Sequence, residues 1–219
     1  MNFEKKDNWS FYWSSMQRSF IERKIQTYKA KNGYAKLLQV IPGIELNGRV
    51  LEIGAGKASI SQILRDRGCH VTAIDLDYNI AKTNCDKVDS YIVGNMLNLP
   101  FKNDSFNLVI SCGLIEHFTL DIVQEIFLEC KRVGRFVVAW FPSCGMAWKV
   151  MWNARNLSGG NIVTEAYTYK REVIENILIS LGFHNVRSGS VLFGGFFTYL
   201  YIYGLSPAFS ADNLAKDIQ

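Results

Sequence analysis

A chain of 219 residues is long enough for one well-buried domain and too short for two ordinary ones. Its composition, 48% hydrophobic and 20% charged, is that of a globular protein. The net charge of +4 is spread along the chain, with no run of Lys or Arg longer than a pair. We therefore expect a single domain, and a dedicated nucleic-acid surface is not indicated.

The chain has five cysteines, at Cys69, Cys85, Cys112, Cys130 and Cys144. Because their number is odd and no pair has the Cys-x-x-Cys spacing of zinc or redox sites, we expect reduced thiols and no bound metal. The first residues are polar and lack the apolar leader of a secreted protein, which predicts a cytoplasmic location. The longest apolar run, Val191 to Tyr203, is too short to span a bilayer as a helix, so no membrane association is expected.

The segment before the first predicted strand is rich in aromatic side chains, and we expect it to form an N-terminal helical cap over residues 1–47. One or two helices are predicted from Trp9 to Tyr34, and a further helical stretch from Tyr34 to Val40. Tyr12 and Trp13 are candidate substrate contacts within this cap. Packing of the segment onto the domain is an equally weighted interpretation of these aromatics.

The stretch from Arg49 to Ser59 predicts a buried strand followed by a tight turn and a helix. Gly54 and Gly56 suit the turn because a residue without Cβ accepts positive φ and lets backbone N–H groups approach a ligand at the helix N-terminus. Asp75 follows after one helix and one more strand, where its carboxylate can accept hydrogen bonds from ribose hydroxyls. The combination indicates an adenosine-containing cofactor.

Strands and helices alternate through the central region, residues 48–141. The expected elements are a helix from Ile60 that Gly68 stops, strand Cys69–Ile74, helix Tyr78–Val88, strand Ser90–Val93, strand Ser105–Ser111, helix Leu120–Arg132 and strand Arg135–Phe141. Such alternation predicts a Rossmann-like, doubly wound α/β fold whose parallel strands bind ligands at their carboxyl ends. Glu52, Asp75, Asn95 and Ser111 fall at or just beyond those ends, so we assign them to the cofactor site.

After Phe141 the alternation breaks off. Residues 142–169 are expected to be a lid or insertion, 170–205 a C-terminal helix with a strand pair, and 206–219 a tail, all within the same domain. Trp148 and Trp152 are candidate substrate contacts in the lid. Their helical spacing is, however, more typical of core packing.

Two details distinguish between cofactors. A dinucleotide fingerprint has a third glycine three residues after the second, and Ser59 stands at that position. Glu52, two residues before the first glycine, would repel a pyrophosphate but attract a cationic amino group such as that of S-adenosylmethionine. These residues disfavour the main alternative, a nicotinamide-dependent oxidoreductase.

Five segments in this order resemble the motifs of the class I S-adenosylmethionine-dependent methyltransferases, in particular the branch that acts on small molecules. They are Val50 to Gly56, Val71 to Leu76, Gly94 to Met96 with Leu99-Pro100-Phe101, Asp104 to Ser111, and Leu114 to Phe118. The resemblance implies a seven-stranded, mostly parallel sheet whose last strand is antiparallel. The strand pair expected between Phe183 and Tyr203 is similar to that ending.

The resemblance also implies cofactor contacts: Glu52, Gly54, Ala55 and Gly56 for the methionine portion, Asp75 for the ribose hydroxyls, Leu76 for one face of the adenine, and Asn95 and Met96 for its edge. Three residues depart from the family pattern. Asn95 and Asn107 stand where Asp is usual, and Ala58 stands where a third glycine is common. The link from Lys131 to Arg135 is also shorter than the usual loop, which predicts a tight turn before the fifth strand.

The implied reaction needs mainly positioning, because the sulfonium already makes the methyl carbon electrophilic. His117 is the candidate general base, since it follows the fourth strand and is expected near the transferred methyl; a structural histidine is the competing interpretation. Glu116 is expected either to orient His117 or to contact the substrate. A protein that binds the cofactor without catalysis, as the partner of an active subunit, is the second alternative to a small-molecule methyltransferase.

Overall fold

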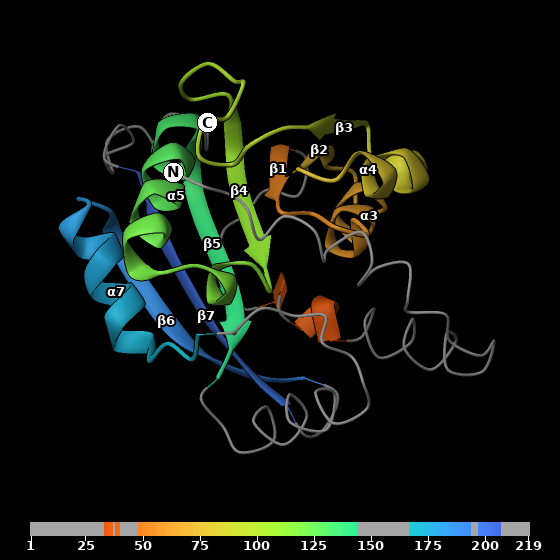
Figure 1. The fold of residues 1–219 in the computed structure, drawn as a ribbon. Helices are drawn as coiled ribbons and strands as arrows, with labels where there is room; N and C mark the ends of the chain where they lie inside the picture. The colour runs from red at the N-terminus through yellow and green to blue at the C-terminus, as the bar shows by residue number, and fades with distance from the viewer. Residues whose placement is uncertain (1–32, 37, 40–47, 144–166, 194–196, 207–219) are drawn as a thin grey trace, which may run out of the picture.

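The computed structural model describes residues 33–36, 38–39, 48–143, 167–193 and 197–206, and within them lies one seven-stranded sheet (Figure 1). Its strands are β1 (Arg49–Ile53), β2 (His70–Asp75), β3 (Ser90–Val93), β4 (Phe106–Cys112), β5 (Gly134–Pro142), β6 (His184–Phe193) and β7 (Phe197–Leu205). The strand order is β3-β2-β1-β4-β5-β7-β6. β1 to β5 pair in parallel, and β7 runs antiparallel to both β5 and β6. The predicted α/β fold with an antiparallel last strand is confirmed.

Helices cover both faces of this sheet. They are α3 (Ser59–Arg65), α4 (Tyr78–Asn84), α5 (Leu120–Val133) and α7 (Arg171–Ser180), with short 3-10 turns η2 (Cys85–Lys87) and η3 (Ile115–His117). Since successive side chains of a strand point to opposite faces, Leu51 and Ile53 of β1 join the core beneath α5 and α7, whereas Val50 joins the core on the other face, beneath α3. The layers are those of a doubly wound fold.

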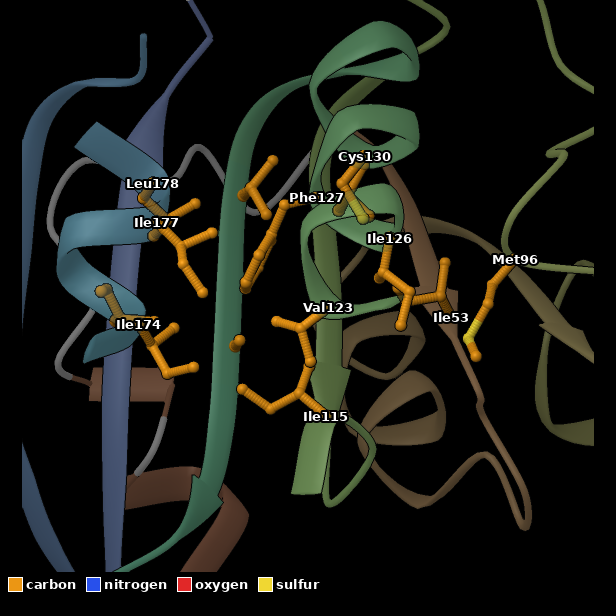
Figure 2. Close-up of a cluster of buried hydrophobic side chains, with 14 of the residues drawn as sticks. Ile53, Met96, Ile115, Val123, Ile126, Phe127, Cys130, Ile174, Ile177 and Leu178 are labelled. Carbon is orange, nitrogen blue, oxygen red and sulfur yellow. The ribbon is translucent and has the colours of Figure 1, made fainter. Parts of the chain in front are cut away.

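The larger core lies between the sheet and the helices α5 and α7. Figure 2 shows Val123, Ile126, Phe127 and Cys130 of α5 directed toward the same layer as Ile174, Ile177 and Leu178 of α7. These positions recur at three- and four-residue spacing, which is why one face of each helix is apolar. The packing fixes α5 against β4 and β5, and so fixes the turn that joins β4 to α5.

Two helices end earlier than the sequence predicts. α3 stops at Arg65, and the chain then turns through Gly68, whose φ of 95° requires the glycine. The helix expected over Tyr78–Val88 ends at Asn84, where the side-chain amide donates to Ile80 O at 2.8 Å and competes with the backbone ladder. A 3-10 turn completes the segment.

The loop after β3 is fastened to α5 by a pair of charged residues. Arg132 donates to Phe101 O at 2.7 Å, to Leu99 O at 2.9 Å and to both carboxylate oxygens of Glu129. Glu129 in turn accepts from Leu99 N at 2.8 Å. A bidentate Arg–carboxylate pair of this kind has a specific geometry, so it holds the Leu99-Pro100-Phe101 segment in one place.

α5 and β5 are joined without a connecting loop, because the strand begins at Gly134 directly after the helix ends at Val133. The tight turn expected there is confirmed. Gly134 is the residue that permits it, since a Cβ at this position would lie 2.3 Å from Val109 Cγ2 and 3.2 Å from the backbone oxygen of Cys130.

The proposed division of the chain is only partly within the described residues. Most of the N-terminal cap (1–47), most of the lid (142–169) and nearly all of the tail (206–219) lie outside them, so these limits stay predictions. In the part of the chain that the structure describes, every helix is too short or too polar to cross a membrane.

We predict that Gly134→Ala destabilises the protein by about 1–3 kcal/mol, because the added methyl group has to displace Val109 or the end of α5. Urea denaturation measures the effect. Val109→Ala alone also destabilises by removing buried apolar surface, but in combination with Gly134→Ala it makes room for the new methyl. The loss in free energy of unfolding is therefore expected to be smaller in the double variant than the sum of the losses in the two single variants. Strict additivity would contradict the steric explanation.

Candidate functional site

The turn between β1 and α3 has a backbone that few side chains tolerate. Gly54 and Gly56 have φ values of 60° and 50°, and Ala58, at the position where a further glycine was noted as usual, has a φ of 51°. A Cβ on Gly54 would also lie 2.5 Å from Leu114 Cδ1. The sequence signal of two spaced glycines therefore has a steric cause, and Ala58 adopts the left-handed conformation despite its methyl group.

Hydrogen bonds with two neighbouring strands, β2 and β3, hold this turn. Ala55 N donates to Ile74 O of β2 at 3.2 Å, and Gly56 N donates to Asp75 Oδ2 at 2.9 Å. Tyr91 of β3 donates its hydroxyl to Gly56 O at 2.7 Å. Tyr91 was not among the predicted site residues; its only signal in the sequence is a polar aromatic side chain just before the aliphatic pair Ile92 and Val93.

Asp75 ends β2 beside the turn. Its Oδ2 accepts from Gly56 N, and its Oδ1 accepts from Asp77 N at 3.0 Å. Burial raises the pKa of Asp75, and the two backbone donors oppose that effect. A carboxylate offers about four acceptor sites, so both oxygens can still accept from ligand hydroxyls.

Glu52, near the end of β1, is buried on the α3 side of the sheet, with an exposed fraction of 4%. Its Oε2 accepts from both the backbone N–H, at 3.0 Å, and the hydroxyl of Ser61 in the first turn of α3. Burial raises the pKa of Glu52 to about 7, and the neighbouring Asp75 acts in the same direction. A second carboxyl therefore lies next to the turn, and a cationic ligand group would favour its ionised form.

The end of β4 contributes a third carboxyl. Glu116, in η3, is buried, and no donor among the described residues reaches its Oε2. Burial raises the pKa of Glu116 to about 8 and lowers that of the neighbouring His117 to about 4. Ser111, the residue predicted at this strand end, is buried within β4 beside Ala139 of β5.

The end of β3 holds the residues predicted to contact adenine. Asn95 Oδ1 accepts from Leu97 N at 2.9 Å, which orders the backbone after the strand. The side chain of Met96 packs in the core near Ile53 (Figure 2), so only its backbone is left for a ligand. Leu76, in contrast, is 48% exposed just after Asp75.

One of the departures noted in the sequence lies away from the site. Asn107, at the start of β4, accepts from Arg49 N at 2.9 Å, so it caps the opposite end of the sheet. The Asn at this position, where Asp is usual in the family, therefore affects the end of the sheet and not the ligand site.

The parallel register brings the strand ends together at one edge of the sheet. Glu52 pairs with Ala73 of β2 and Ile110 of β4, and Asp75 pairs with Val93 of β3. Glu52, Asp75 and Asn95 thus share an edge with the turn that carries Glu116. The candidate substrate residues Tyr12, Trp13, Trp148 and Trp152 lie outside the described residues. Among the residues described, no cluster of His, Cys, Asp and Glu is arranged to hold a metal ion.

These features place three carboxyls around one glycine turn, whose Ala55 and Gly56 N–H groups donate within the protein. Such a site favours a ligand that combines a positively charged group with hydroxyls, because the buried carboxyls gain most from a nearby cation. The exposed Leu76 adds an apolar surface at the same edge.

Comparison with known proteins agrees with this chemistry. Residues 51–136 match the family described as "Methyltransferase domain". A malonyl-[acyl-carrier protein] O-methyltransferase of Enterobacter lignolyticus is 30% identical over 118 residues, which are 47% of this chain and 45% of that protein. The chain thus matches about half the length of this curated relative.

Solved structures share the fold across nearly the whole chain. The magnesium protoporphyrin IX methyltransferase of Synechocystis PCC 6803, with bound SAH, superposes with a TM-score of 0.65 at 19% identity, over 94% of this chain and 96% of that one. A possible histamine N-methyltransferase of Thermotoga maritima gives a TM-score of 0.64 at 14% identity, over 84% and 95%. Neither alternative considered from the sequence, the oxidoreductase or the non-catalytic partner, is supported by these matches.

The buried carboxyls predict how stability depends on pH. A carboxyl whose pKa is 4.5 when unfolded and about 7 (Glu52) or about 8 (Glu116) when folded binds its proton more tightly in the folded state. The free energy of unfolding therefore falls as pH rises from 4.5 to about 8, by up to about 1.4 kcal/mol per pH unit for each such group. His117 opposes this fall only between about pH 4 and 6.5.

We expect the fall to be clearest between pH 6.5 and 8, where His117 no longer contributes, in denaturant titrations at several pH values. Glu116→Gln removes one titrating carboxyl and is expected to flatten the curve. Glu125→Gln, on the exposed face of α5, is the matched control and should leave the slope unchanged. Equal slopes in all three proteins would contradict the assignment.

Proposed function

We propose that this chain, whose residues 51–136 belong to the methyltransferase domain family, transfers a methyl group from S-adenosylmethionine to a small-molecule acceptor by in-line displacement. The observation that carries the proposal is the arrangement of Glu52 and Asp75 on either side of the glycine turn. The chain has the class I methyltransferase fold, and two structures of the Synechocystis relative hold SAH or SAM.

The residues fit this methyl donor. Glu52 is the buried carboxyl suited to its ammonium group, and Asp75 has acceptor positions for its ribose hydroxyls. The backbone between Gly54 and Gly56 can approach the methionine portion closely because neither glycine has a Cβ. Leu76, the backbone of Met96 and the side chain of Asn95 are proposed to contact the adenine, and Ser111 to support the end of β4 beneath the site.

The donor supplies an electrophilic methyl carbon and a neutral leaving group. What the protein adds is position, and holding two reactants in line can contribute about 7–11 kcal/mol to lowering the barrier. The hydrogen bonds that the turn donates to Ile74 and Asp75 and accepts from Tyr91 fix it before a ligand arrives. Preorganisation of this kind lowers the cost of binding.

The relatives suggest different acceptors. The printed names include a malonyl-[acyl-carrier protein], a magnesium porphyrin and, as a possibility, histamine. Their shared feature is the methyl transfer, and the acceptor varies among them. We propose a small-molecule acceptor for this chain; Tyr12, Trp13, Trp148 and Trp152 remain proposed contacts to it.

The proposal is tested by adding S-adenosylhomocysteine and NADH separately in a thermal-shift assay. We expect the first to raise the melting temperature and the second to leave it unchanged. Asp75→Asn should weaken S-adenosylhomocysteine binding about tenfold or more in calorimetry, because it replaces a charged acceptor by a group that is partly a donor. Asp86→Asn, an exposed change on η2, is the control. Stabilisation by NADH alone, or equal affinity of both variants, would reject the assignment.

His117 has a separate prediction. With a pKa lowered to about 4 it is neutral at pH 7 and is a weak base, so we propose that its imidazole hydrogen-bonds and orients the acceptor. His117→Ala is then expected to keep affinity for S-adenosylhomocysteine and to lower turnover in a methyl-transfer assay. Turnover equal to that of the unmodified protein would remove His117 from the mechanism.

A further inference from the structure

Glu116 is a buried carboxyl with an unused acceptor. Its exposed fraction is 4%, and Oε2 receives no hydrogen bond from any residue that the structure describes. Leaving a buried polar atom unpaired costs about 1–3 kcal/mol, so such an atom in a cluster of site residues points to a ligand that completes it. The fold alone gives no reason for a carboxyl here.

The position of Glu116 relative to the glycine turn follows from its neighbours. The Oε1 atom of Glu116 lies 3.5 Å from the position that a Cβ on Gly113 would occupy. Leu114, which follows Gly113, packs against Gly54 of the turn. Burial raises the pKa of the Cys112 thiol at the end of β4, and the charges of Glu116 and Glu52 act in the same direction. Glu116 and Glu52 therefore border the same small region above the turn.

The backbone around Glu116 is fixed as well. Tyr167 N donates to Glu116 O at 2.6 Å, and the hydroxyl of Tyr169 donates to Phe118 O. The chain that leads into α7 is thus tied to η3 on both sides of His117. This attachment limits the positions that the Glu116 side chain can take.

We propose that Glu116 is the group that takes the proton from the acceptor, that it becomes ionised when the cationic methyl donor binds, and that the acceptor is consequently an O–H or N–H compound. The inference rests on the proposed methyl transfer. In the reaction, the carbon–sulfur bond breaks as a bond forms between the methyl carbon and the acceptor oxygen or nitrogen. The electron pair of the broken bond stays on sulfur, giving a neutral thioether, and the acceptor's proton passes to Glu116.

Among the residues that the structure describes, Glu116 forms no ion pair. Cys112 on β4 lies close enough to Glu116 for the two groups to interact electrostatically, and His117 is neutral at pH 7. β5 packs against η3, and its only charged side chain, Arg135, stands at the far end of the strand. With the pKa of Glu116 at about 8, the positive sulfonium is the charge that can shift it below neutrality.

This coupling has a readout that does not depend on activity. S-adenosylmethionine and S-adenosylhomocysteine share the ammonium and carboxylate groups and differ in the charge at sulfur. Calorimetric titrations at pH 7 in two buffers of different ionisation enthalpy give the number of protons released with each ligand. We expect S-adenosylmethionine to release up to about one proton more than S-adenosylhomocysteine, because only the sulfonium ionises Glu116.

Four variants identify the group that releases the proton. Glu116→Gln is expected to abolish the difference between the two ligands, and Glu125→Gln to keep it. Glu52→Gln should reduce the release that both ligands share and leave the difference intact, because Glu52 is proposed to meet the ammonium group. Glu116→Asp keeps a carboxyl and should keep a difference; it serves as the second variant if Glu116→Gln fails to fold, as judged from its melting temperature and circular dichroism.

Several results would overturn the inference. Equal proton release with both ligands in the unmodified protein, or a difference that persists in Glu116→Gln, would remove Glu116 as the ionising group. Equal release together with turnover that falls above pH 8 would indicate the opposite role, a neutral carboxyl donating to an anionic acceptor. Failure of both ligands to bind would instead reject the proposed function, so the two failures can be told apart.

Discussion

The site depends on one backbone turn being held in a conformation that it would not keep alone. Gly54, Gly56 and Ala58 all have positive φ, and the hydrogen bonds that oppose their relaxation come from β2 and β3. The ladder of parallel strands is therefore what shapes the ligand-binding backbone. The carboxylate of Asp75 has two roles. Its Oδ2 accepts the hydrogen bond that fixes Gly56, and the same carboxylate is proposed to bind the ribose hydroxyls.

Acidic groups are buried around that turn, and their burial determines the electrostatics of the site. Glu52 and Glu116 both lie in surroundings that favour their neutral forms, and within the described residues neither forms an ion pair. Buried charge without a partner is costly, so burial favours the protonated forms of Glu52 and Glu116. A positively charged ligand exchanges with those protons, which links binding to pH.

Much of the fold and part of the site could be predicted from the sequence. Alternating apolar strands and amphipathic helices gave the element order, and the glycine spacing with Glu52 and Asp75 gave the ligand edge, because these signals are local. Tyr91 could not be predicted, since its hydroxyl meets Gly56 only through the pairing of β1, β2 and β3. The same is true of Arg132, whose bonds to Leu99 and Phe101 span more than thirty residues.

The direct join between α5 and β5 restricts where the chain can vary in length. Side chains of β5 alternate between the two layers, with Val137 and Ala139 on the α5 side and Trp140 on the other. One residue inserted after Val133 would reverse this alternation and move the indole of Trp140 to the α5 side of the sheet. Insertions, tags and new chain ends in homologues or engineered versions thus belong elsewhere, for example in the exposed bend near Asn103.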